Sequence, residues 1–432
     1  MNKILIILVL VNLVVNCATT SGPRSSETFK QDAVELKRQL KANPGDAAVL
    51  RDIGVLCYEN NYHSLALKYL VRAFKADMND AKTNAYFGLV LEALKKEPLA
   101  LRIYKRFARF PVGSMFRDVM EGRYYLLVKN RMQNDVKSRI AAADGSRMQP
   151  EAVAVFPLEY KGRNREYASM GRGLSEMIIT DLSSVPDLTL IERVRIQSML
   201  DEMQLGESGI VDQSTAPQYG KVVSAGKMVH GSFNVRNGRE LLIDVALWDV
   251  IKQRFPEFEN KEESLKNFFV VEKAIVFDLI DALEIELTPV QREKIMRVPT
   301  KNLNAFLAYC NGLEKEDTGD YKGAARYFQK AVKMDPGFKQ AEARARTSSA
   351  IQLSSQPYQL RMADNSGADV PSSGATQPII QDIVVDRYSK LSVNTRSSLV
   401  PGQDSRKSAE EAQKSGSEYF QELPLPPLPP PR

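Results

Sequence analysis

The sequence predicts a central α/β domain of layered α-β-α type, flanked by all-α helical repeats and followed by a disordered C-terminal tail. Three observations support this fold class. Strand-like and helix-like hydrophobic patterns alternate between Ala152 and Asp249. Small residues recur 34 residues apart on the N-terminal side of that region. Beyond about residue 351 the helical period is lost, and Ser, Gln, Asp, Gly and Pro dominate.

The first 16 residues have the pattern of an export signal. One positive charge in Met1-Asn-Lys3 precedes an apolar run from Ile4 to Val15, which is too short to cross about 30 Å of hydrocarbon. Val14-Val-Asn-Cys17 resembles a bacterial lipobox, in which the cysteine is acylated. We expect residues 1–16 to be a lipoprotein signal peptide and Cys17 to be the lipid anchor. An ordinary secretory signal that ends near a cysteine is the alternative.

Acylation would hold the protein at a membrane. Several acyl chains on one cysteine make an anchor effectively permanent, whereas a single chain holds only marginally. Residues 17–29 are mostly small and polar and predict a flexible tether. Ala18, rather than an aspartate, follows the cysteine, and this resembles the sorting pattern of outer-membrane lipoproteins. The expected location is the periplasmic side of the outer membrane.

Length, charge and cysteine content limit the possible number of domains, the class of partner and the state of the thiols. The 432 residues are enough for two or three domains, and their net charge of +6 is mild for that length. The export signal argues against nucleic acid as a partner. Cys57 and Cys310 lie in helical patterns beside apolar residues. Two buried free thiols are expected, with a disulfide as the alternative.

Residues 30–110 show the 34-residue period. It relates Gly54 to Gly88 and Ala66 to Ala100, and it resembles the tetratricopeptide repeat, in which small residues let two helices approach closely. Two helical hairpins are expected here, preceded by a half-repeat at about residues 32–42. Residues 111–148 form a predicted connector, which contains a long helix from Phe116 to Ala143.

A separate repeat is predicted at residues 298–350. It resembles the same family more closely through Gly312, Gly319-Asp-Tyr321, Ala324, Phe328, Ala331 and Asp335-Pro336. A single repeat cannot bury its hydrophobic face alone, so we expect it to dock on another element. The preceding helix, predicted from Leu265 to Leu287, is the nearest candidate.

The α/β domain is predicted over residues 149–297. Its elements are a strand at Ala152–Leu158, a helix around Leu174–Leu182, a strand from Leu188 to Arg193, and a hairpin that turns at Asn237-Gly238. After Asp249 a short loop leads to a helix predicted to begin near Glu262.

Short motifs in this domain resemble the curli-secretion CsgG family and the related N-terminal domain of TolB. They are Gly171-Arg-Gly173-Leu-Ser, Ile191-Glu-Arg193, Glu202-Met-Gln-Leu205, Ser208-Gly209-Ile-Val-Asp212, Gly220-Lys221 and Ala225-Gly-Lys-Met-Val-His-Gly231-Ser232. The resemblance implies an envelope protein that works by binding other proteins. Pore-forming members carry two long membrane-crossing hairpins, for which this chain has no length after Ser232 or Asp249.

No catalytic, cofactor-binding or metal-binding residues are expected. His63, placed in a repeat loop, and His230, placed at a strand end, lack carboxylate partners at ligand spacing. Gly171-Arg-Gly173 lacks the third glycine of a dinucleotide fingerprint. Gly206-Glu-Ser-Gly209 has the same weakness, and we interpret it as a turn between helices.

Two segments of the tail differ from their surroundings. Residues 378–386 are β-prone and could pair with a sheet edge. Residues 423–432 are proline-rich and predict a stiff polyproline II rod, which serves either as a spacer or as a Pro-x-x-Pro ligand.

Together these features predict a non-enzymatic lipoprotein scaffold for a secretion, surface-fibre or flagellar-type envelope complex. Its partners would be envelope proteins, bound through the repeats and the α/β domain. An oligomeric secretion channel like that of curli is the alternative, and a homo-oligomer therefore stays open. An enzyme with an unfamiliar site is a third hypothesis.

Overall fold

A computed structural model describes residues 26–142, 148–185, 188–203, 215–254, 258 and 261–355. Within these residues the chain forms two compact units, residues 26–121 (unit 1) and 122–355 (unit 2). Cys17, Gly206-Glu-Ser-Gly209 and both tail segments named above lie outside the described residues. None of the described helices is long and apolar enough to cross a membrane.

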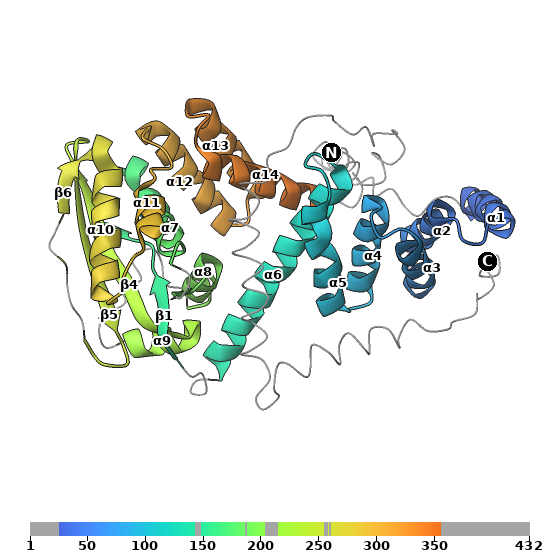
Figure 1. Ribbon diagram of the computed structural model, residues 1–432, viewed down its shortest axis with the longest axis horizontal. Helices are drawn as coiled ribbons and strands as arrows, with labels where there is room; N and C mark the ends of the chain where they lie inside the picture. The colour runs from blue at the N-terminus through green and yellow to red at the C-terminus, as the bar shows by residue number, and fades with distance from the viewer. Residues whose placement is uncertain are drawn as a thin grey trace, which may run out of the picture. The chain divides into compact units, whose positions relative to one another are not determined.

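Unit 1 is built from antiparallel helix pairs (Figure 1). Its elements are α1 (Ser26–Ala42), α2 (Ala47–Glu59), α3 (His63–Ala76), α4 (Ala81–Ala93), α5 (Glu97–Tyr104), a 3-10 turn (Lys105–Arg109) and the first turns of α6 (Met115–Ala141). Carboxylates cap two of these helices. Asp46 accepts hydrogen bonds from the backbone N–H groups of Ala48 and Val49, and Asp80 accepts one from Thr83.

The glycines of the 34-residue period are contact points between paired helices. A Cβ atom built on Gly54 would lie 2.5 Å from Cγ of Leu70, and one built on Gly88 would lie 2.1 Å from Cε1 of Tyr104. Each glycine therefore makes room for a large side chain of the facing helix. This confirms the predicted helical repeats.

Unit 2 contains a mixed sheet. Its strands are β1 (Gln149–Val155), β2 (Glu159–Tyr160), β3 (Thr189–Leu190), β4 (Ala225–Arg236), β5 (Glu240–Asp249) and β6 (Lys261–Ser264). The order is β3-β1-β4-β5-β6, with β2 paired to β4. Pairings of β1 are parallel, and β4, β5 and β6 form an antiparallel meander. Asn237 and Gly238, with φ of 51° and 64°, form the predicted tight turn.

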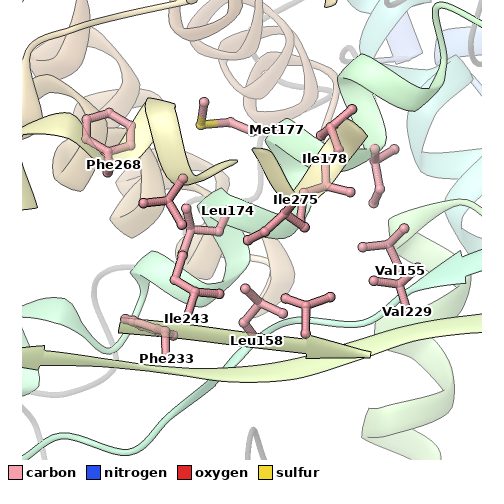
Figure 2. Packing of buried hydrophobic residues seen from close by; sticks show 14 of the residues in the cluster. Val155, Leu158, Leu174, Met177, Ile178, Val229, Phe233, Ile243, Phe268 and Ile275 are labelled. Carbon is pink, nitrogen blue, oxygen red and sulfur yellow. The ribbon is translucent and has the colours of Figure 1, made fainter. Parts of the chain in front are cut away.

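Helices cover both faces of this sheet. On one face α7 (Met170–Leu182) and α10 (Phe268–Ala282) enclose the larger hydrophobic core. Figure 2 shows Leu174 and Ile275 lying over the strands that carry Phe233 and Ile243. The opposite face packs against α8 (Arg193–Glu202), α9 (Ala216–Val223) and Val136 of α6. The predicted α-β-α layering is thereby confirmed.

Helices complete unit 2. They are α11 (Pro289–Met296), α12 (Leu303–Asp317), α13 (Tyr321–Met334) and α14 (Lys339–Ser354). Gly312 repeats the contact seen in unit 1, because a Cβ built there would lie 2.5 Å from Cε1 of Phe328.

Four local predictions were wrong. The helix expected from near Glu262 begins only at Phe268, because residues 261–264 pair with β5 as a strand. The strand expected to run to Arg193 is confined to Thr189–Leu190, and Arg193 instead begins α8. The two histidines were also misplaced, since His63 is the first residue of α3 and His230 lies inside β4.

Candidate interaction site

The Gly171-Arg172-Gly173 motif lies where the α/β domain meets the downstream repeat. All three residues are in the first turn of α7, which is buried along nearly its whole length. A Cβ on Gly171 would lie 2.0 Å from the carbonyl oxygen of Leu158, so Gly171 fits closely against the segment that follows β1. The motif that is too sparse for a phosphate loop is therefore a packing motif.

Gly173 faces the other way, toward α12. A Cβ at this position would lie 2.2 Å from Sγ of Cys310 and 2.8 Å from Cζ of Phe306. Phe306 in turn stacks on Phe268, the first residue of α10, with ring centroids 4.4 Å apart. The docking surface of the repeat was predicted to be the helix before it. That prediction was incomplete, because α12 packs principally on α7 and meets α10 at this end.

Six charged side chains pair with one another across the contact between the α/β domain and the repeat, and we call them the junction. Three come from the α/β domain (Arg172, Glu176, Arg193) and three from the repeat (Glu316, Asp317, Arg344). Asp317 accepts a hydrogen bond of 3.0 Å from Nε of Arg172 and also pairs with Arg193. Arg344 bridges the two sides, because its Nη2 lies 2.7 Å from Glu176 Oε1 and its Nη1 lies 2.7 Å from Glu316 Oε1.

The junction is electrically balanced and shielded from water. Three cations face three anions, and the Arg193 side chain is only 9 % exposed. Burial works against the charged form of Arg193, but Asp317 and Glu316 outweigh it and raise its pKa. An ion pair of this kind persists only when every member has partners, because an isolated buried charge is costly. The junction therefore fixes how the repeat sits on the α/β domain.

The C-terminal part of α6 forms a second connection within unit 2. A Cβ on Gly122 would lie 2.2 Å from the carbonyl oxygen of Ala350 in α14. Farther along, Lys129 donates a hydrogen bond of 3.0 Å to the hydroxyl of Tyr321. At its far end, Asp135 binds Arg195 of α8 at 3.0 Å. One helix thus contacts both the repeat and the α/β domain.

A sequence signal for this connection exists and was missed. Gly122 follows Gly88 by the same 34 residues that separate Gly88 from Gly54. The start of α6 at Met115 likewise falls 34 residues after the start of α4 at Ala81. By period, α6 is the first helix of a third repeat, and α14 occupies the space beside its glycine.

The two histidines considered as possible catalytic or metal-binding residues lie in different elements, His63 in α3 and His230 in β4. The ring centroids of His63 and Tyr58 lie 5.5 Å apart, and those of His230 and Trp248 lie 3.7 Å apart. Burial lowers the pKa of His230, and Asp244 opposes that shift. No three His, Cys, Asp or Glu side chains gather as a metal site anywhere in the described ranges.

The two remaining cysteines are packing residues. Cys57 and Cys310 are buried free thiols. Burial raises the pKa of Cys57 to about 12, and it also raises the pKa of Cys310. Because the thiolate is the reactive form, neither side chain is suited to nucleophilic chemistry.

Comparisons with known proteins agree with this architecture in part. The family model of the curli production assembly/transport component CsgG matches residues 123–234, and this match begins within α6. A comparison with curated proteins gives no match.

Two solved structures are similar to parts of the chain. The C-terminal domain of LpoB from Salmonella enterica is 16% identical over 31% of this chain and 93% of that one, with a TM-score of 0.22. A tetratricopeptide repeat protein from Parabacteroides merdae is 14% identical over 75% of this chain and 95% of that one, also with a TM-score of 0.22. The chain therefore combines a region that matches the CsgG family model, residues 123–234, with paired helices that pack as helical repeats.

Proposed function

We propose that this protein is a non-enzymatic lipoprotein of the bacterial outer membrane, anchored through Cys17 and facing the periplasm. It acts as a scaffold in the assembly of a secretion, surface-fibre or flagellar-type complex. The CsgG match supports a place in the bacterial envelope, since that family is described as an assembly and transport component. Folds of the CsgG and tetratricopeptide types are generally not catalytic.

The junction is the observation that carries this proposal. It joins a CsgG-family domain to a helical repeat through buried, mutually paired charges. Partner residues for these charges lie on both sides of the contact, so the two modules hold a defined orientation. Two protein-binding surfaces in a fixed orientation are what a scaffold needs to position two partners relative to each other.

We assign a part in this role to each segment of the chain. Residues 1–16 are the signal peptide, 17–29 the tether, and 30–110 a repeat array that binds envelope proteins. Residues 111–148 connect this array to the α/β domain at 149–297, and 298–350 form the docked repeat. The described part of the chain ends just after α14, which continues to Ser354, four residues beyond the predicted end of the repeat. Nucleic acid is not among the proposed partners, because export would separate the protein from it.

Site-specific photocrosslinking in intact cells tests the scaffold role. A photoreactive residue is placed at Val34, Met78 or Val112, which are 68%, 54% and 51% exposed apolar positions of unit 1. Exposed polar positions of the same unit, Lys41 and Lys95, serve as matched controls. We expect the same envelope protein to be captured at two or more apolar positions and far less at the controls.

Either of two results would contradict the proposal. Equal, diffuse capture at apolar and control positions would argue against a specific partner. Size-selective dye leakage from vesicles that contain the purified protein would instead favour the secretion channel, because a scaffold that does not cross the bilayer leaves vesicles sealed.

A further inference from the structure

One helix of the downstream repeat carries an unusual charge pattern. In α13 the basic residues recur at intervals of four, four and three, and the helix contains no Asp or Glu. All four basic side chains are exposed, and we call them the basic stripe: Lys322, Arg326, Lys330 and Lys333. Figure 1 shows α13 as the orange helix at the upper margin of unit 2.

Helix geometry explains why the four charges share a face. Residues three or four apart lie on the same side of an α-helix. The opposite side of α13 is buried through Ala324, Phe328 and Ala331, which belong to the core of the repeat. From Lys322 to Lys333 the stripe is about 16 Å long at 1.5 Å per residue. It is therefore a straight row of cations on the outer surface of the repeat.

The stripe contributes no ion pair to the described part of the fold. Like charges at such spacing repel and weaken a helix slightly. None of the four cations forms an ion pair with any described residue. The buried arginines nearby behave differently, since Arg344 is bound by Glu176 and Glu316. Charge that is unpaired within the described fold is available to an external anion.

We propose that the basic stripe lies on an anionic lipid surface. The stripe lies along the exposed face of a single helix, and three of its four cations are lysines. A lysine is a point charge without the bidentate geometry that selects a defined carboxylate partner. A bilayer offers phosphates at any spacing along a plane, which suits a straight row of such charges. Met334, 40% exposed at the end of the helix, adds an apolar contact.

This inference goes beyond the scaffold role and does not depend on acylation. Cys17 and α13 are far apart in the sequence. An anchor alone holds the chain near the bilayer, whereas the stripe would set which surface of unit 2 faces it. Membrane attraction of basic side chains decays within a Debye length, so it applies only when the helix lies against the surface.

Vesicle flotation with unacylated protein tests the inference. The unacylated mature chain, residues 18–432, is mixed with vesicles of phosphatidylcholine alone or with about 30% phosphatidylglycerol. We expect binding to the anionic vesicles only, weakening as ionic strength rises from about 0.05 to 0.3 M. The quadruple variant Lys322→Gln, Arg326→Gln, Lys330→Gln and Lys333→Gln should bind at least about tenfold more weakly.

A charge-matched variant separates the stripe from net charge. It changes Lys41, Lys96, Lys266 and Lys294 to Gln, which removes four exposed charges scattered over the chain. We expect its binding to stay within about threefold of the parent. Glutamine is a good helix former, so circular dichroism should be unchanged in both variants.

Three outcomes would overturn the inference. They are no flotation of the parent protein, equal flotation with both vesicle types, and equal loss in the stripe and scattered variants. Crosslinking of α13 to an acidic envelope protein, in the absence of vesicle binding, would assign the stripe to a protein partner instead. If the stripe proposal fails while photocrosslinking at Val34 and Met78 succeeds, the scaffold role still stands.

Discussion

Gly173 on α7 and Cys310 on α12 are so close that a Cβ atom on the glycine would lie 2.2 Å from the sulfur. The two residues are far apart in sequence and belong to different predicted domains. Their contact therefore reports whether the repeat is docked on the α/β domain. It also explains why Cys310 is buried without being reactive, since its thiol fills the space left by a missing side chain.

Gly173→Ala should loosen this contact. The added methyl group meets both Cys310 and Phe306, and overpacking of this kind costs about 1–3 kcal/mol. Chemical unfolding of unit 2 can be followed by fluorescence of Trp248, the single tryptophan of the chain. Adding Cys310→Ala to Gly173→Ala should recover part of the loss, because it removes the sulfur. Purely additive losses in the double variant would contradict this packing.

Arg193→Met should cost about 3 kcal/mol of the unfolding free energy of unit 2, because it leaves three largely buried carboxylates facing only two arginines. The additional change Asp317→Asn should cost less in this background than in the parent. A suitable control within unit 2 is Arg297→Met, since Arg297 pairs with Glu293 at the surface and exposed pairs contribute little. Similar effects of both arginine substitutions would show that the junction does not orient the repeat.

The elements with strong local signals were predictable. Asn237-Gly238 specifies its turn because both residues tolerate positive φ, and the hairpin registers β4 on β5 as expected. Small residues at the 34-residue period predicted the paired helices, because close helix approach leaves no room for a side chain. In each case the deciding interaction lies within one hairpin, where spacing along the chain translates directly into contact.

The junction could not be predicted in the same way. Arg172 and Asp317 are 145 residues apart, and in isolation Glu316 and Asp317 resemble an ordinary solvated helix end. Strand β6 was missed for a related reason. Its sequence Lys261-Glu-Glu-Ser264 has little strand propensity, and pairing with β5 at the edge of the sheet overrides it. Tertiary contacts of this kind have no local pattern.

Cys17→Ala tests the membrane anchor. If Cys17 is acylated, the variant should lose palmitate labelling and leave the membrane fraction, because the tether itself has little apolar surface. The control is Cys57→Ala, which removes a buried thiol of α2 and should leave labelling intact. Persistent labelling of the Cys17→Ala chain would show that the anchor has been assigned to the wrong residue.

Glu272 should make unit 2 less stable at higher pH. This residue of α10 is fully buried beside Asp181 of α7, and Lys273 Nζ lies 3.3 Å from its carboxylate while also pairing with Asp181. Burial, together with Asp181, raises the pKa of Glu272 well above its ordinary value of 4.5, although Lys273 acts in the opposite direction.

The sign of the effect follows from proton binding. Above pH 4.5 the unfolded chain releases the proton of Glu272 while the folded chain retains it, so stability falls as the pH rises toward the folded pKa. Glu272→Gln keeps the shape without the ionisation, and it should therefore stabilise unit 2 increasingly as the pH is raised from about 5 to 8. Urea unfolding monitored at Trp248 measures the difference, with exposed Glu262→Gln of β6 as the control. A difference that is constant across this pH range would show that Glu272 is ionised in the folded protein throughout.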